Sequence, residues 1–250
     1  MTIVTWNCNM AFRKKAQLLM RYNPDILVIP ECECLEKLVF PNEVPVPGSA
    51  VWYGDNPNKG LGIFAYGGLK LKRRRIHDSR FRFIVPVSVV GNGLELSLYA
   101  VWANNPKDPE GTYVEQVWKA INVYKKHIRK KQTILLGDFN SNTIWDRKYR
   151  KGNHSHVVEF LDKKGIKSAY HAHHAKVQGK EEHPTLYMYR HLDKPYHLDY
   201  CFLSNDLRAR IVNVEVGSYD EWSAYSDHVP LIITLASGTR NEQNVNSNKE

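Results

Sequence analysis

Short apolar runs recur along the chain, and their Val, Ile and aromatic content with flanking Gly, Pro or Asn predicts β-strands. We expect strands at Thr2–Trp6, Ile26–Ile29, Leu61–Ala65, Phe83–Val90, Leu94–Trp102, Thr133–Leu136, Leu198–Leu203, Ile211–Val216 and Leu231–Leu235. The Gly91-Asn92-Gly93 segment between two of these runs is typical of a hairpin turn.

Apolar residues at helical spacing predict helices at Lys14–Arg21, Tyr113–Ile128 and Val157–Lys163. Helices interleaved with strands and hairpins, without a regular βαβ rhythm, indicate a mixed α/β layered domain. No internal linker stands out, so we expect one domain over residues 1–236. Residues 237–250 are polar, with Val245 as their one large apolar residue, and are typical of a flexible tail.

The composition narrows the class of protein. A hydrophobic content of 42% and a charged content of 24% over 250 residues are ordinary for a globular domain with a sizeable core. The net charge of +9 favours a polyanionic partner such as nucleic acid or an anionic membrane surface, although a basic protein without such a partner has the same charge. Nothing in the pattern indicates an obligate protein partner.

The cellular location is predicted to be cytoplasmic. No signal peptide precedes the first strand, and no apolar stretch approaches the roughly 20 residues that span a bilayer, so we expect no membrane partner. The four cysteines, Cys8, Cys32, Cys34 and Cys201, lack zinc-site spacing and are expected to be buried thiols.

Polar side chains lie at the edges of five apolar runs, which read TWNCN, ILVIPE, ILLGDFN, LDYCF and SDHVPL. The ends of strands are where α/β proteins gather their chemistry. Almost all of these polar groups are hard oxygen donors, with one imidazole among them. The pattern therefore predicts a single site for Mg²⁺, or Mn²⁺ in its place, and a phosphate ester.

Asp138 and Asn140 form the densest of these endings. The acid is suited to activating a water and the amide to orienting it, although Gly-Asp-x-Asn alone is often only a turn. Glu31, with the amides Asn7 and Asn9, is suited to a Mg²⁺ site, and Glu31 alone would read as an exposed strand-end acid.

Ser226-Asp227-His228 brings an acid and an imidazole together, and Asp199 is suited to orienting His228. No serine in a Gly-x-Ser-x-Gly context is present, and no cysteine has an evident thiolate setting. Attack by an activated water is therefore favoured over covalent catalysis.

WNCN, PDILVIPE, GDFN, HLDY and SDHVPL, in this order over nearly the whole chain, resemble the endonuclease/exonuclease/phosphatase superfamily of exonuclease III-like and deoxyribonuclease I-like enzymes. The resemblance implies a four-layer α/β/β/α sandwich of two packed mixed β-sheets flanked by helices. It also implies site roles. Mg²⁺ would be held by Glu31 with Asn7, Asn9 and Asp227, the water and scissile phosphate handled by Asp138 and Asn140, and phosphate charge stabilised by His228 with Asp199.

Thr185 and Tyr187 match a Thr-rich segment that precedes the Asp-Tyr strand in the superfamily, and are carried over as substrate contacts. Two residues depart from the family pattern. Pro30 replaces the usual Gln before the metal Glu, and Trp102 stands where such nucleases often place an Asn-x-Tyr or a catalytic His. Trp102 does not ionise, which puts abasic-site endonuclease activity in doubt, but its ring is suited to stacking on a base.

Other clusters allow two interpretations. Basic and aromatic residues around Trp145 predict substrate contacts or a loop packed over the core, and Arg190 is expected in the substrate wall. The basic run at residues 70–82 predicts a phosphate-backbone contact or a charged strand edge. Basic residues 125–131 suit the end of a helix. His171, His173 and His174 lack the spacing of a zinc site.

The sequence thus predicts a Mg²⁺-dependent phosphoesterase, and favours a phosphodiesterase that hydrolyses nucleic acid by attack of a metal- and Asp-activated water. One alternative is the same chemistry on a small phosphorylated metabolite or a lipid headgroup. The other is a non-catalytic nucleic-acid-binding module that keeps the fold. DNA or RNA as substrate, and endo or exo action, stay open.

Overall fold

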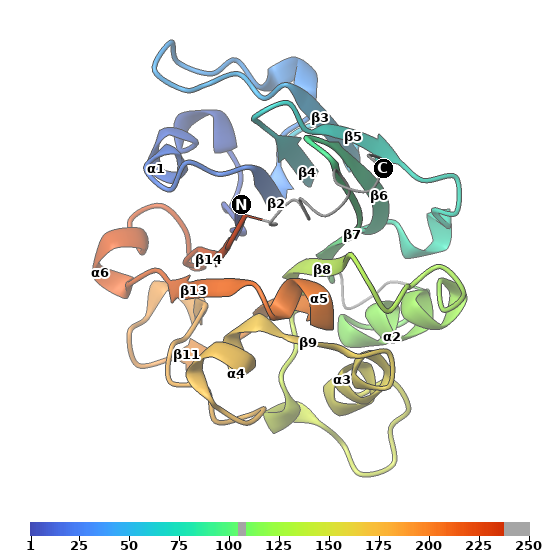
Figure 1. Ribbon diagram of the computed structural model, residues 1–250. Coiled ribbons are helices and arrows are strands. Elements are labelled where there is room, and N and C mark those ends of the chain that lie inside the picture. The colour runs from blue at the N-terminus through green and yellow to red at the C-terminus, as the bar shows by residue number, and fades with distance from the viewer. Residues whose placement is uncertain (105–108, 238–250) are drawn as a thin grey trace, which may run out of the picture.

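The computed structural model describes residues 1–104 and 109–237, so the predicted tail from residue 238 onward lies outside the described residues. Two six-stranded mixed sheets form its centre (Figure 1). The first sheet has the order β13 (Ile211–Val216), β14 (Leu231–Leu235), β1 (Thr2–Thr5), β2 (Ile26–Cys32), β4 (Lys59–Ala65), β3 (Ser49–Asn56). The second has the order β5 (Lys70–Arg73), β6 (Ile84–Gly91), β7 (Leu94–Trp102), β8 (Thr133–Asp138), β12 (Asp199–Ser204), β9 (Ile166–Ser168).

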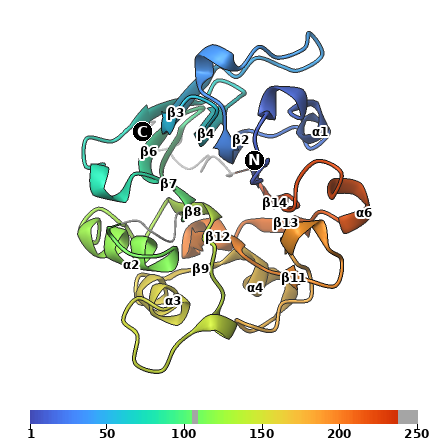
Figure 2. The ribbon, with the colours of Figure 1, turned by 180° about the vertical axis from the view of Figure 1, so that it is seen from behind.

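Helices cover both outer faces, with α1 and α6 on one flank and α2 and α3 on the other (Figures 1 and 2). The helices are α1 (Gln17–Met20), α2 (Val114–Val123), α3 (His154–Asp162), α4 (Ala169–His174), α5 (Asn205–Arg208) and α6 (Tyr219–Trp222). Single 3₁₀ turns lie at Phe12–Lys14, Leu35–Lys37, Ser79–Phe81, Thr143–Trp145 and Met188–Arg190, and β10 (Leu186–Tyr187) pairs with β11 (Pro195–Tyr196).

Three hydrophobic cores separate the four layers. The first, which includes Ile63 and Leu98, lies between the two sheets. The second packs α2 and α3 on the second sheet, and the third packs α1 and α6 on the first sheet. The central strands are covered on both faces, which is why their sequences are nearly continuous apolar runs. The predicted four-layer α/β/β/α sandwich is confirmed.

Two predicted helices are shorter than expected. The backbone leaves helical geometry at Lys15, where φ is −123°. The side chain of Lys15 donates from Nζ to the carbonyls of Cys8 (2.6 Å) and Tyr225 (2.7 Å). The predicted helix Lys14–Arg21 is therefore divided into a 3₁₀ turn and α1. Helix α2 ends at Val123, before the predicted Ile128, because the backbone departs from helical values at Tyr124.

The four cysteines are free and buried, as predicted. In the described part of the chain, none of the helices is both long and apolar enough to cross a bilayer.

Candidate active site

The second sheet places three predicted residues in one row. Strand β8 runs parallel to β7 and antiparallel to β12, and the registers pair Asp138 with Trp102 on one side and with Asp199 on the other. Asp138 ends β8 and Asp199 begins β12. The two acids therefore lie side by side where β8 ends and β12 begins, although 60 residues lie between them in the sequence.

The glycine of the Gly-Asp-x-Asn turn makes this register possible. Gly137 has φ 143°, and a Cβ at this position would lie 1.9 Å from the carbonyl oxygen of Val101. Any other residue would force β8 away from β7. Asn140, with φ 46°, occupies the left-handed region that Asn tolerates better than most residues. The motif is therefore required by the backbone as well as by the chemistry.

Asp138 is fully buried and held by three N–H groups. Its Oδ1 accepts the Asn140 backbone N–H (2.9 Å), and its Oδ2 accepts the side-chain amides of Asn140 (2.9 Å) and Asn7 (3.1 Å). Burial raises the pKa of Asp138 toward neutrality, and the Asp199 carboxylate adds to this, whereas His228 lowers it. The carboxyl is thus oriented and made more basic than an exposed aspartate.

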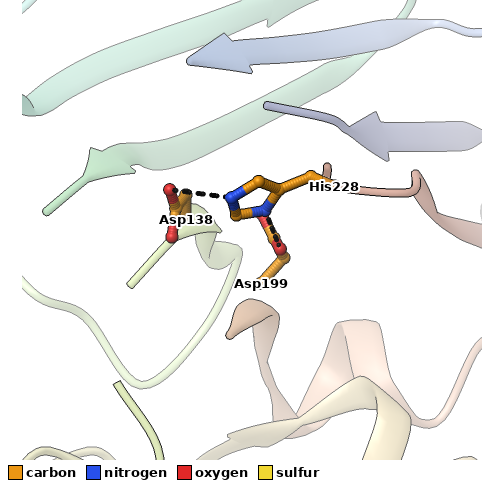
Figure 3. Close-up of side chains that lie close together, drawn as sticks. All are labelled: Asp138, Asp199 and His228. Atoms are coloured by element: carbon orange, nitrogen blue, oxygen red, sulfur yellow. Dashed lines mark hydrogen bonds and ion pairs between the residues drawn. The ribbon is translucent and has the colours of Figure 1, made fainter. Parts of the chain in front are cut away.

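His228 lies between two carboxylates (Figure 3). Its Nδ1 is 2.8 Å from Asp199 Oδ2, and its Nε2 is 3.9 Å from Asp138 Oδ2. Burial disfavours the imidazolium, but Asp199 and Asp138 outweigh burial and raise the pKa of His228 well above its usual value. The ring is therefore positively charged at neutral pH, with its Nε2–H on the side of Asp138.

Glu31 enters from the first sheet through a β-bulge. The β2–β4 register shifts between Pro30 and Cys32, and Glu31 has φ 62°. A bulge turns a side chain out of the regular alternation and is frequent next to active sites. Glu31 Oε1 is 3.5 Å from the amide nitrogen of Asn7, and its Oε2 is 3.1 Å from Lys59 Nζ.

These groups face one cavity of about 560 Å³ at the end of the sandwich. Eight of the predicted site residues line it: Asn7, Asn9, Glu31, Trp102, Asp138, Asn140, Asp227 and His228. Asp199 lies directly behind His228. The cavity collects groups from both sheets, which is possible only because the two sheets are packed face to face.

The predicted substrate contacts are placed differently. Trp102 lines the cavity, with its ring packed on Phe83 at 4.6 Å between centroids. Trp145 lines a neighbouring cavity of about 150 Å³ that shares Asn140 with the first. Thr185, Tyr187 and Arg190 are not among the residues that line either cavity.

Thr185 is fully buried, and its hydroxyl accepts the N–H groups of Leu198 and Asp199, both at 2.9 Å. Tyr187 packs against Tyr219, and Arg190 donates to the carbonyl of Ala224. Thr185 and Tyr187 thus lie outside both cavities, and their contact with substrate stays a prediction. Thr185 fixes the start of β12, and with it Asp199.

The residues of the cavity fit a hard divalent cation. Glu31, Asp138 and Asp227 are carboxylates at the cavity surface and Asp199 lies just behind it, whereas Lys59 and His228 are the cations among the residues that line it. The ligand atoms of Asp138, Asp199 and His228 lie within 4.8 Å of one another and form a group that could hold a metal ion. Because Asp199 already accepts from His228, the more open Glu31 and Asp227 suit Mg²⁺ better.

The amides have less direct positions. The side-chain NH₂ group of Asn7 donates hydrogen bonds to Asp138 and Glu31, and its side-chain oxygen accepts the Asn9 N–H at 3.2 Å. Asn7 therefore links two carboxylates in this structure. Its role as a metal ligand, and that of Asn9, stay predictions.

Lys59 and Ser226 contact the residues of the site and were not predicted. Lys59 lies at the start of β4 and reaches Glu31 only through the bulged register, which no local pattern signals. Ser226 is fully buried and its hydroxyl donates to the Asn7 carbonyl (2.7 Å) and accepts the His228 N–H (3.1 Å). Ser226 directly precedes Asp227 and His228 in the sequence, and this position was the one indication that it belongs to the site.

The histidine-rich segment is separate from this site. His171 lies on α4, and its two ring nitrogens contact Ser168 Oγ (2.8 Å) and Glu181 Oε1 (2.9 Å). Within residues 1–104 and 109–237, the cluster of acids and imidazoles compact enough for a metal is at Asp138 and not here.

No family model and no curated protein sequence matches the chain. Solved structures do resemble it. The 3′ phosphatase NExo from Neisseria bound to a product DNA hairpin has a TM-score of 0.67 and 20% identity, with 95% of this chain and 100% of that chain covered. An AP endonuclease from Archaeoglobus fulgidus has a TM-score of 0.67 and 15% identity, with coverages of 95% and 100%.

An endonuclease/exonuclease/phosphatase family protein from Leptotrichia buccalis has a TM-score of 0.62 and 15% identity, again with 95% and 100% covered. At these identities the likeness concerns the fold, and it extends over the whole length of each neighbour. The chain therefore has the fold of the endonuclease/exonuclease/phosphatase superfamily.

Proposed function

We propose that this protein is a metal-dependent phosphoesterase, and that its substrate is a phosphodiester of nucleic acid. The observation that carries the proposal is the arrangement of Asp138, His228 and Asp199 beside Glu31 at a single cavity. A carboxylate base can accept the proton of an attacking water, and a charged imidazole a few ångströms away can stabilise the charge that develops on a phosphate ester.

Glu31 and Asp227 would hold Mg²⁺, with Asn7 and Asn9 in support, and when bound the ion would neutralise charge on the phosphate oxygens. Mn²⁺ has the same preference for oxygen ligands. Lys59 adds a fixed positive charge 3.1 Å from Glu31.

Asp138 would accept the proton of the attacking water at a carboxylate oxygen. Asn7 and Asn140 hold this carboxylate in one orientation, and its raised pKa makes it a better base near neutral pH. As the water oxygen bonds to phosphorus, the opposite P–O bond breaks. The leaving oxygen keeps the electron pair and takes a proton from solvent.

His228 would stabilise the negative charge that develops on the phosphate. Its Nε2 is 3.9 Å from Asp138 Oδ2, too far for a hydrogen bond, so the Nε2–H is free to donate to a phosphate oxygen in the cavity. Asp199 keeps the ring charged and fixes its orientation through Nδ1. The fully buried Thr185 and Ser226 hold the backbones of these two residues.

Nucleic acid is favoured as the substrate class by the net charge of +9. The structural neighbours include nucleases and a 3′ phosphatase bound to DNA, which supports the same class. The buried free thiols support the predicted cytoplasmic location.

The test is a substrate panel of plasmid, single strands, abasic duplex, RNA and small phosphoesters, each with and without EDTA. We expect hydrolysis of nucleic acid that EDTA abolishes, and a fall of about 10³-fold or more in kcat for Asp138→Asn. Asp162→Asn, on the outside of α3 and half exposed, is the matched control and should retain full activity. Near-normal turnover by Asp138→Asn would contradict the proposal. Turnover that is restricted to small esters and insensitive to salt would favour the alternative substrate, a small phosphorylated metabolite.

A further inference from the structure

A second polar cavity, of about 310 Å³, lies where the edge strands of the two sheets meet. It is lined by Tyr53, Arg73, Arg74, Arg75, His77 and Ser79. Strand β3 is the edge of the first sheet and β5 the edge of the second, and they lie side by side (Figures 1 and 2). The Leu71 N–H donates to Ser49 Oγ at 2.9 Å, which ties the two edges together.

The hydrophobic core ends at this cavity. On the inward face of β5, Leu71 packs against the core between the sheets. The next inward position is Arg73, whose guanidinium lies 5.4 Å from the centre of the Tyr53 ring. Arg74 donates from Nη1 to the hydroxyl of Tyr99 at 3.2 Å. The side chains that follow Leu71 along the chain are thus cationic at the point where the core between the sheets ends.

The charges at this cavity are not neutralised by carboxylates. Elsewhere in the same basic run, Arg80 pairs with Asp78 and Arg82 with Asp55, each at 2.7 Å. In the described ranges, Arg73, Arg74 and Arg75 have no carboxylate within 4.0 Å. Three guanidinium groups around one small cavity repel one another, and a bound anion relieves this repulsion.

Protection of a sheet edge does not account for the arrangement. Charged side chains on an edge strand block edge pairing, and Lys70 and Lys72 already supply two such charges on β5. Arg73, Arg74 and Arg75 instead line the same cavity as the His77 imidazole and the Ser79 hydroxyl. Several planar donors with a hydroxyl beside them match the oxygens of a phosphate group.

The cavity lies at the same end of the sandwich as the candidate active site. Because β6 is antiparallel to both β5 and β7, these two strands run in the same direction and end at Arg73 and Trp102. A row of ring contacts joins the two cavities. Trp102 is 4.6 Å from Phe83, Phe83 is 6.3 Å from Tyr53, and Tyr53 is 4.5 Å from His77. Trp102 and Phe83 are buried, so this row of rings fixes the spacing between the cavities.

We propose that the cavity lined by Arg73, Arg74 and Arg75 binds a backbone phosphate of a nucleic-acid strand whose cleaved phosphate lies in the active site. The inference rests on the proposed function, since it assumes a strand long enough to reach both cavities. It predicts that a dinucleotide uses the active site alone, and that longer strands gain affinity from the arginines.

The test compares two double variants with the same loss of charge. Arg73→Gln/Arg75→Gln removes two exposed cations of the cavity and leaves Arg74 bonded to Tyr99. Lys126→Gln/Lys130→Gln removes two exposed cations between α2 and the start of β8, at the end of β8 opposite Asp138. Both are made with Asp138→Asn so that the strand stays intact. Binding of labelled single-stranded DNA and RNA is measured from about 50 to about 200 mM salt.

We expect Arg73→Gln/Arg75→Gln to bind both strands about tenfold more weakly than the control, with a salt slope shallower by about one. Turnover of a small phosphodiester, measured with Asp138 restored, should be unchanged in both double variants. Equal affinities and slopes for the two double variants would overturn the phosphate site, even in an active enzyme. Loss of affinity only in the arginine variant, in a protein that cleaves no ester, would instead refute the proposed function and keep the site.

Discussion

Two buried histidines of this protein differ in charge because of their neighbours. His228 and His154 are 5% and 1% exposed. His228 lies between Asp199 and Asp138, which raise its pKa above the usual value in spite of burial. His154 contacts the Ser141 hydroxyl (2.8 Å) and the Tyr200 ring, and burial lowers its pKa to about 4.

The two histidines show that burial alone does not decide whether a buried imidazole is charged. Burial disfavours the charged form of both imidazoles, and the pKa is raised in the one that has a carboxylate oxygen within 4.0 Å of each ring nitrogen. A charged imidazole thus lies beside the ends of β8 and β12, and a neutral one lies at the first residue of α3. A count of histidines does not distinguish them, whereas the position of Asp138 and Asp199 does.

The largest effect is expected from making His228 resemble His154. Asp199→Asn removes the charge that keeps the imidazolium stable while it retains a side chain of the same shape. We expect kcat for nucleic-acid hydrolysis to fall about 10³-fold with little change in KM. Asp193→Asn, at an 80% exposed side chain, is the control. Wild-type turnover by Asp199→Asn would show that the charge on His228 is irrelevant.

A pH effect on stability is expected from His154. In the unfolded chain its pKa is near 6.5, so as the pH falls from 6.5 toward 4 the unfolded state binds a proton that the native state does not. Stability is therefore complete above pH 6.5 and declines by about 3 kcal/mol toward pH 4. Denaturant unfolding of His154→Gln should show a shallower decline than the exposed control His173→Gln, and equal declines would refute this account.

A smaller effect is expected at Thr185, which fixes the backbone of Asp199. Thr185→Val leaves the N–H groups of Leu198 and Asp199 without their acceptor, and should cost about 2 kcal/mol of unfolding free energy. Thr185→Ser keeps the hydroxyl and should cost less than half as much. If both variants unfold at the same denaturant concentration, the hydroxyl does not hold β12.

Three predicted strands agree with the structure at both ends. Leu94–Trp102 and Leu231–Leu235 match the covered strands β7 and β14, and Ile211–Val216 matches β13 at the edge of the first sheet. Strand β5 was missed because Lys70-Leu71-Lys72-Arg73 has too few apolar positions to signal a strand, and the edge strand β3 was also missed.

The candidate site was predicted in the same uneven way. Asp138, Asp199 and His228 stand beside apolar runs and could be recognised from them. Lys59 and the bulge at Glu31 depend on which strands pair and in which register, and such long-range pairing leaves no local trace. Thr185 was predicted as a substrate contact, and in the structure it is buried with its hydroxyl accepting the Asp199 N–H.

The pairing of β1 with β14 brings residues from the two ends of the described chain into the site. Asn7 follows β1, and Ser226, whose hydroxyl donates to the Asn7 carbonyl, precedes β14. Strand β14 must also insert between β13 and β1. His228 therefore reaches its place beside Asp138 only once β14 has paired with β1. The acid and the imidazole of the proposed site are thus assembled by pairing between strands that lie far apart in the sequence.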